Sequence, residues 1–142
     1  MAALREAKSL GARILSIVNV VGSSIARESD DVLYTWAGPE IAVATTKAYS
    51  TQMAVLDLLA VYLAAQRKTI SAEEAGRLTA AIAALPAQVE QILSSREQIQ
   101  YYASQYFNHD SVFFIGRNLD YALGMEGSLK LKEISYIHSE AY

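Results

Sequence analysis

Three apolar runs along the chain have the length and composition of β-strands. Residues 12–24, ARILSIVNVVGSS, form a nearly continuous β-branched run that ends in a Gly-Ser-Ser turn. Residues 32–40, VLYTWAGPE, form a second run after an acidic turn, and residues 111–118, SVFFIGRN, form a third that ends at Gly116. Apolar runs without polar alternation are typical of strands covered on both faces. The pattern therefore predicts buried strands in these three places.

Helical signals occupy the segments between these runs. The first residues predict a helix that ends at Gly11, because glycine adopts the left-handed conformation of a helix stop at little cost. Residues 45–66 are apolar nearly all round, which predicts a helix in a core or against a partner subunit. Ser71 and Glu74 fit a capping box, so we predict a helix that starts at Ala72.

Pro86 is expected to interrupt this helix, because an interior proline loses a hydrogen bond and clashes with the preceding turn. We predict a further helix over residues 87–107, and interpret the two helices as a connector. A last helix is predicted over residues 119–135, directly after the third strand.

The alternation of strands with long helices predicts the fold class. Such an order is typical of an α/β protein with a three-layer αβα arrangement and a parallel sheet in the middle. Three strands make a thin sheet for this architecture, so we expect an incomplete version of the fold.

Composition and charge exclude several function classes. The 142 residues are 52% hydrophobic and 19% charged, which is typical of a folded globular chain. The net charge of −3 offers no basic surface for nucleic acid, and the lack of cysteine excludes disulfides and a thiol nucleophile. The N-terminus has no apolar signal region, and the apolar stretch 53–65 is too short to span a membrane, so we expect a cytoplasmic protein.

The histidines do not predict a metal centre. His109 and His138 are isolated in the sequence, and no His, Asp or Glu pattern has the spacing of metal ligands. We therefore expect neither a metal nor another cofactor.

Three charged residues near the end of the chain share one edge of the last predicted helix. Glu126, Lys130 and Glu133 are spaced i, i+4, i+7. They could form an ordinary charge ladder worth about 0.2–0.5 kcal/mol per pair. Because apolar residues flank them, a glutamate facing a cleft could instead act as a proton-transferring base. The spacing alone leaves both interpretations open.

Thr45 and Thr46 follow a strand and open a helix. A threonine in this position is commonly an N-cap that accepts a backbone hydrogen bond. The same position in α/β proteins also receives anionic ligands, because helix N–H groups point there. The residues do not decide between a cap and a ligand contact.

Three long segments resemble a known enzyme family. GRNLDYALGMEGSLKLKEISYIHSEAY, GPEIAVATTKAYSTQ and ILSIVNVVGSSIARESD are similar to segments of the isomerase half of glutamine:fructose-6-phosphate aminotransferases. The resemblance runs through essentially the whole chain. It implies a SIS-type, flavodoxin-like fold. Residues 1–68 would form the C-terminal part of a first SIS domain, 69–110 a helical connector, and 111–142 the N-terminal part of a second SIS domain.

The resemblance also implies roles for five residues. Glu133 corresponds to the base that moves a proton between C1 and C2 of the sugar, and Lys130 assists in charge or proton handling. The backbone of Val43 and the hydroxyl of Thr45 would contact the sugar, although the family often has serine at the latter position. Glu126 would orient Lys130.

Essential parts of the family's site would lie outside this chain. By the resemblance, the phosphate-binding loops lie upstream, and a ring-opening histidine and a lysine lie downstream. We therefore expect this chain to be inactive by itself. We expect it to be part of a longer enzyme that acts on fructose 6-phosphate or glucosamine 6-phosphate. Its incomplete faces predict a homo-oligomer. The alternative is a non-catalytic SIS module for sugar-phosphate binding or assembly, with Glu133 and Lys130 as a surface pair.

Overall fold

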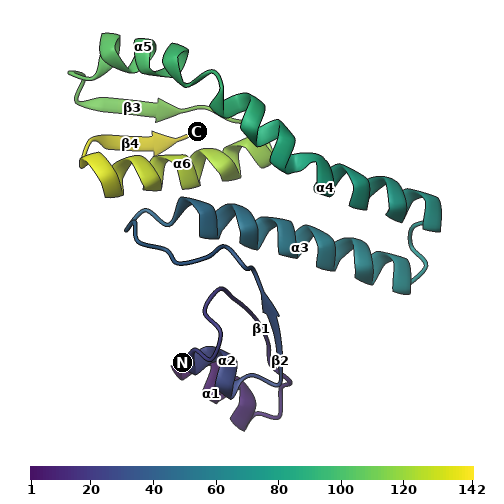
Figure 1. The fold of residues 1–142 in the computed structure, drawn as a ribbon. Helices are drawn as coiled ribbons and strands as arrows, with labels where there is room; N and C mark the ends of the chain where they lie inside the picture. Colours follow the sequence, from purple (N-terminus) through teal and green to yellow (C-terminus); the bar gives the residue numbers. More distant parts are fainter. The chain divides into compact units, whose positions relative to one another are not determined.

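A computed structural model describes residues 1–142 and divides them into two compact units. Unit 1 comprises Met1–Ile41 and Thr45–Ala83, and unit 2 comprises Ala42–Ala44 and Ala84–Tyr142. The elements, labelled in Figure 1, follow in the order α1 (Ala2–Ser9), β1 (Leu15–Val18), α2 (Ser24–Glu28), β2 (Asp31–Tyr34), α3 (Thr46–Gln66), α4 (Ala72–Leu93), α5 (Arg96–Tyr106), β3 (Ser111–Phe114), α6 (Leu119–Ser135) and β4 (His138–Ala141).

Unit 1 contains a parallel pair of strands. β1 and β2 pair with Leu15 opposite Asp31 and with Val18 opposite Tyr34. The connection between them includes the short helix α2, whose start is capped by the Ser23 hydroxyl. Both strands are predicted from the apolar runs and are confirmed. Helix α2 was missed, because the Gly-Ser-Ser segment was interpreted only as a turn.

The predicted stop of the first helix is confirmed. Gly11 has a φ of +81°, and its N–H donates to the Lys8 carbonyl at 2.9 Å. The N–H of Ala12 donates to the Ala7 carbonyl at 3.0 Å. These bonds satisfy carbonyl groups that the end of α1 would otherwise leave without partners.

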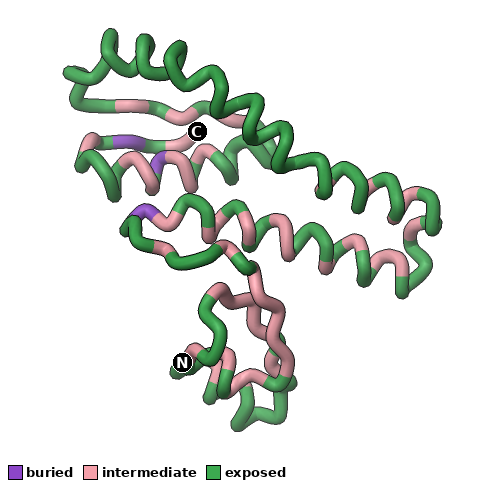
Figure 2. Tube along the Cα trace, viewed as in Figure 1, coloured by how far each residue is buried: buried purple, intermediate pink, exposed green.

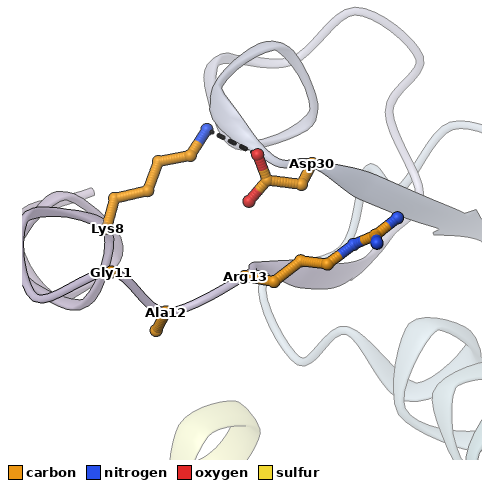
Figure 3. Close-up of a pocket in the computed structure, with 5 residues that line it drawn as sticks. All are labelled: Lys8, Gly11, Ala12, Arg13 and Asp30. Atoms are coloured by element: carbon orange, nitrogen blue, oxygen red, sulfur yellow. Dashed lines mark ion pairs between the residues drawn. The ribbon is translucent and has the colours of Figure 1, made fainter.

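Charged side chains fasten α1 and the following turn to the region around the start of β2. Three ion pairs do this: Arg5 with Glu28 at 2.6 Å, Lys8 with Asp30 at 3.2 Å, and Arg13 with Asp31 at 2.7 Å. Figure 3 shows Lys8, Arg13 and Asp30 around an open hollow of about 570 Å³, which Gly11 and Ala12 also line. None of the predicted site residues lines this hollow.

Hydrogen bonds lower the pKa values of these three carboxyl groups. The main donors are Arg5 to Glu28, the backbone N–H of Ile14 to Asp30, and Arg13 to Asp31. A carboxylate that accepts hydrogen bonds or lies beside a cation keeps its charge to lower pH.

Unit 2 contains a second parallel pair, formed by β3 and β4. Ser111 lies opposite His138, and Phe114 lies opposite Ala141. Two further backbone bonds extend the pair, from Tyr142 to the Phe114 carbonyl at 2.9 Å and from Gly116 to the Tyr142 carbonyl at 2.8 Å. The prediction of three strands is therefore wrong, because the chain has four in two parallel pairs. β4 was missed because the short segment HSEA has no apolar pattern.

Small residues bring α6 close to the strands of unit 2. A Cβ atom on Gly127 would lie 2.9 Å from the Phe114 ring, and one on Gly124 would lie 3.5 Å from the Phe114 Cβ. Ser128 continues this face of α6 and is buried. Larger side chains here would push the helix away from the sheet.

The helical pair breaks at a different place from the one predicted. The capping prediction holds in part, because the Ser71 hydroxyl accepts the Glu74 N–H at 3.0 Å. The predicted interruption at Pro86 is wrong, because α4 runs through this proline to Leu93. A proline removes one hydrogen bond, and turns on both sides can hold the helix together as a kinked rod.

The actual break lies at Ser94 and Ser95. The Ser94 hydroxyl donates to the Gln91 carbonyl at 2.6 Å, and the Ser95 hydroxyl donates to the Ile92 carbonyl at 2.7 Å. Such local bonds compete with the helix and favour its end. The predicted helix over residues 87–107 is thus the end of α4 followed by α5.

Few side chains are buried. The buried residues are Ala44, Ser128 and Ser139, and Figure 2 shows α5 exposed along its whole length. Two parallel strand pairs with helices fit the predicted incomplete three-layer α/β fold. By length and composition alone, α3 could cross a membrane, with a mean hydropathy of 1.3, but core helices of soluble proteins meet the same criterion.

Acid is expected to destabilise unit 1. The folded-state pKa values of Glu28, Asp30 and Asp31 lie below their ordinary values of 4.5, 3.8 and 3.8. Their contribution is therefore present above these ordinary values and is lost as pH falls through the lower folded-state values. Urea unfolding between pH 6 and pH 2 should show this loss. Arg13→Gln should weaken it, whereas the control Arg96→Gln should leave it intact, and equal effects of the two variants would refute the prediction.

Gly116→Ala is expected to destabilise unit 2. A Cβ here would lie 2.4 Å from the backbone carbon of Asp120, in the first turn of α6. We expect a loss of about 1–3 kcal/mol in the free energy of unfolding, as for other overpacked sites. The control Gly76→Ala has open space and should stabilise α4 by about 0.5–1 kcal/mol. Denaturant unfolding measures both, and effects of the same sign would contradict the expected clash at Gly116.

Candidate active site

A pair of buried hydroxyl groups fixes how α6 lies on β4. The Ser139 hydroxyl donates to the Ser128 carbonyl at 2.8 Å, and the two hydroxyl oxygens lie 3.0 Å apart. Because the Ser139 proton goes to this carbonyl, the Ser128 hydroxyl donates to Ser139. Residues two apart on a helix project from nearly opposite sides. Lys130 and Glu126, each two residues from Ser128, therefore lie on the side of α6 away from this contact.

The structure brings the three predicted charged residues together. Lys130 Nζ lies 2.8 Å from Glu133 Oε2 and 3.3 Å from Glu126 Oε1. The side chains are partly covered, with exposed fractions of 19% for Lys130, 26% for Glu126 and 31% for Glu133. One ammonium thus bridges two carboxylates on a single helix edge, as the spacing predicted.

This arrangement changes the titration of the Lys130 ammonium. Its pKa is raised, chiefly by the hydrogen bond to Glu133. Burial opposes this effect, and the hydrogen bond to Glu126 adds a smaller increase. A lysine with a raised pKa stays protonated at neutral pH and is a poor proton acceptor. Among the three groups, proton abstraction would fall to a carboxylate, with Lys130 supplying positive charge.

A hollow of about 210 Å³ lies beside this region of α6, between the helix and β4. Its lining residues are Met125, Ser128, Lys132, Glu140 and Ala141. None of the three bridged charges lines it. The structure also has no group of three or more His, Cys, Asp or Glu side chains placed to hold a metal ion.

The predicted sugar-contacting residues lie in the loop between β2 and α3. Val43 is 87% exposed, and Thr45 stands at the N-cap position of α3. The side chain of Thr45 makes no capping hydrogen bond, and its backbone has a φ of +52°. Thr45 thus occupies the N-cap position, but the expected capping hydrogen bond of its hydroxyl is not formed, so the capping interpretation is wrong. A β-branched residue in the left-handed region costs of order 1–3 kcal/mol, and such strain is found mostly at functional sites.

The two compact units divide the predicted residues between them. Val43 belongs to unit 2, as do Glu126, Lys130 and Glu133, and Thr45 belongs to unit 1.

Asn19 and Lys47 were missed by the sequence reasoning. Asn19 makes three hydrogen bonds to the loop after β2, and the Lys47 ammonium donates to the Pro39 carbonyl. A signal for Asn19 was present, because it is an isolated amide in the apolar run IVNVV, where a buried polar group needs partners. Lys47 gave no such signal.

Comparison with known proteins supports one family. A SIS domain model matches residues 1–62. Over all 142 residues the chain is 59% identical to the glutamine–fructose-6-phosphate aminotransferase (isomerizing) of Symbiobacterium thermophilum and 54% identical to that of Clostridium acetobutylicum. The whole chain is thus similar to one part of these aminotransferases. It spans 23% of the length of these curated relatives.

The same family is found among solved structures. The C-terminal domain of glucosamine-fructose-6-phosphate aminotransferase from Francisella tularensis matches with a TM-score of 0.94 and 36% identity, over 99% of this chain and 40% of that chain. The family resemblance and the SIS-type α/β fold are thereby confirmed. The three-part domain division and the roles of the five residues stay predictions.

Glu133→Gln should lower the pKa of Lys130 toward its ordinary value of 10.5, and by more than Glu126→Gln does. The reason is that the shorter contact, to Glu133, is the largest cause of the raised pKa. An NMR titration of the Lys130 side-chain carbon next to Nζ measures both changes. Glu97→Gln on α5 serves as the control and should leave the titration unchanged. An equal or larger effect of Glu126→Gln would disprove the assignment.

Proposed function

We propose that this chain carries part of the isomerase site of a glutamine–fructose-6-phosphate aminotransferase that uses a hexose 6-phosphate. The contact of 2.8 Å between Lys130 and Glu133 carries the proposal, because it places a proton acceptor beside a fixed positive charge. The similarity to these aminotransferases supports it. Since the chain spans 23% of the curated relatives, we assign the activity to the longer protein rather than to these 142 residues alone.

Glu133 is proposed as the group that moves the proton. Its carboxylate would take a proton from C1 of the ketose imine. The electrons left behind would form a double bond between C1 and C2 as the π electrons of the C2=N bond move to the nitrogen, which takes up a proton. The same carboxyl group would then return its proton at C2 while the C1 hydroxyl gives up its proton and becomes the aldehyde, which yields the amino aldose. One positioned carboxylate can perform both transfers because the two carbons are adjacent.

Lys130 is proposed to stabilise the negative charge that develops on the substrate while the proton is on Glu133. Its raised pKa keeps the ammonium form at neutral pH. A fixed cation close to developing negative charge lowers the barrier without reorganising during the reaction. Glu126, 3.3 Å from Lys130 Nζ, would hold the ammonium in place.

Val43 and Thr45 are proposed to contact the sugar through a backbone group and a hydroxyl. Two features support this. Both residues lie in the loop after β2, and in parallel α/β sheets ligands bind at the carboxyl ends of the strands. The left-handed conformation of Thr45 is also the kind of strain that persists at ligand sites.

We further propose that the longer protein is a cytoplasmic homo-oligomer. Large apolar side chains are exposed on α4 and α5, among them Val89, Ile92, Tyr102 and Tyr106. Exposed apolar surface of this kind favours association. We retain the division into residues 1–68, 69–110 and 111–142 as a proposal for the domain boundaries.

Glu133→Gln in the longer aminotransferase is expected to reduce glucosamine 6-phosphate formation about 10²–10⁴-fold, the range for loss of an acid–base group. The amide keeps the shape of the side chain but cannot accept the proton. Product formation from fructose 6-phosphate and glutamine measures the effect. Glu90→Gln on the exposed face of α4 is the matched control.

An unchanged rate in Glu133→Gln would reject the proposed proton transfer. It would favour the alternative function, a SIS module that binds a sugar phosphate or serves in assembly. In that case Lys130 and Glu133 would be a pair on the helix surface, which their exposed fractions of 19% and 31% also permit.

A further inference from the structure

A side chain outside the predicted site fastens the loop between β2 and α3. Asn19 comes directly after β1, and its carboxamide makes three hydrogen bonds to the start of the loop. Its Oδ1 accepts from the Thr35 hydroxyl at 3.0 Å and from the Ala37 N–H at 2.8 Å. Its Nδ2 donates to the Gly38 carbonyl at 2.6 Å. The loops that follow the two strands are thus joined by one side chain.

The two ends of this carboxamide have fixed roles. The Ala37 N–H can only donate and the Gly38 carbonyl can only accept, so the partner must offer an acceptor and a donor side by side. An aspartate at position 19 would keep the acceptor and lose the donor. An alanine would lose all three bonds. Asparagine is therefore the side chain that matches this loop.

These bonds hold a backbone conformation that is unfavourable by itself. Trp36 has a φ of +53°, between the two neighbours that bond to Asn19, and Gly38 has a φ of +71°. The left-handed region is costly for any residue with a Cβ atom. The Trp36 side chain is 75% exposed, so burial does not impose this conformation. The hydrogen bonds of Asn19 hold the residues on either side of Trp36, and the Trp36 ring also contacts the Tyr34 ring, with ring centroids 5.6 Å apart.

The loop has a second anchor further along. The Lys47 ammonium, in the first turn of α3, donates to the carbonyl of Pro39. Asn19 thus fixes the course of residues 35–38, Lys47 fixes residue 39, and the chain then continues to Val43 and Thr45. No helix or strand lies between these anchored residues and the segment Val43–Thr45.

We propose that Asn19 is a positioning residue for the sugar-contacting segment Val43–Thr45. It does not touch the sugar, and it acts by holding residues 35–38 in the strained course that leads to this segment. This inference rests on the proposed function, because it needs the sugar to bind at Val43 and Thr45. Its two parts, the hold on the loop and the effect on the sugar, can be measured separately.

The hold on the loop is tested in the 142-residue chain with Asn19→Ala, Asn19→Asp and the control Asn108→Ala, whose side chain has no hydrogen bond in the structure. Hydrogen exchange at the Ala37 amide should be about 10-fold faster in Asn19→Ala, the effect of losing one net hydrogen bond. Asn19→Asp should show a smaller change, because it keeps the acceptor. The anisotropy of Trp36, the one tryptophan of the chain, should fall in the same order.

Two outcomes of this experiment would overturn the proposal that Asn19 holds the loop. One is unchanged exchange at Ala37 in Asn19→Ala. The other is an equal loss of protection throughout β1 and β2, which would mean that Asn19 supports the unit as a whole. If Asn19→Ala does not fold, Asn19→Asp decides the matter, because it loses the donor to the Gly38 carbonyl. Unchanged Trp36 anisotropy in Asn19→Asp would then overturn the hold on the loop.

The effect on the sugar is tested in the longer aminotransferase. Asn19→Ala should raise the KM for fructose 6-phosphate about 10-fold and change kcat much less, because a displaced loop weakens binding without removing the base. A loosened loop with unchanged KM would overturn the link to the sugar. Failure of the proposed function is a distinct result, since it would show as full activity of Glu133→Gln whatever Asn19 does.

Discussion

The close approach of α6 to β3 and β4 is the constraint on which the candidate catalytic residues depend. Parallel strands cannot be joined by a tight turn, so β3 reaches β4 only through a helix that crosses the sheet. Gly124, Gly127 and Ser128 let this helix lie directly on the strands, and the hydroxyl pair of Ser128 and Ser139 fixes its rotation. With the rotation fixed, the edge that carries Lys130 is fixed as well.

Polar contacts hold unit 1 together more than a buried core does. Ion pairs fasten α1 to the end of α2 and to the residue before β2, and a single carboxamide, that of Asn19, fastens the loop after β2. Such contacts have strict geometry, so they define the course of a loop more sharply than apolar burial does. The contacts of Asn19 lie on both sides of Trp36, which has a left-handed conformation. Trp36 and Thr45 both lie beyond the carboxyl end of β2, where α/β folds bind ligands.

The scarcity of buried residues agrees with the similarity of this chain to one part of longer proteins. A helix as apolar as α3 is normally covered on most sides, yet none of its residues is buried here. Relatives in the aminotransferase family are longer, since the chain spans 23% of their length. The incomplete sheet consists of two separate strand pairs, each of which has the parallel topology of a larger α/β sheet.

The sequence alone was sufficient for features that depend on neighbouring residues. The apolar runs predicted β1, β2 and β3, Gly11 predicted the end of α1, and the spacing of the three charges predicted that Glu126, Lys130 and Glu133 would meet. Side chains three or four residues apart on a helix are close whatever the rest of the fold does. The similarity to the aminotransferases was also recognisable from the sequence, because long motifs carry it.

The tertiary structure decided the features that depend on distant partners. β4 is a strand because β3 offers it a register across α6, although its own residues are polar. Thr45 has a left-handed backbone in place of a capping hydroxyl, and Asn19 meets a loop that begins sixteen residues later. Spacing along the chain cannot reveal these contacts, because hydrogen bonds between segments form only after the strands and the crossover have set their positions.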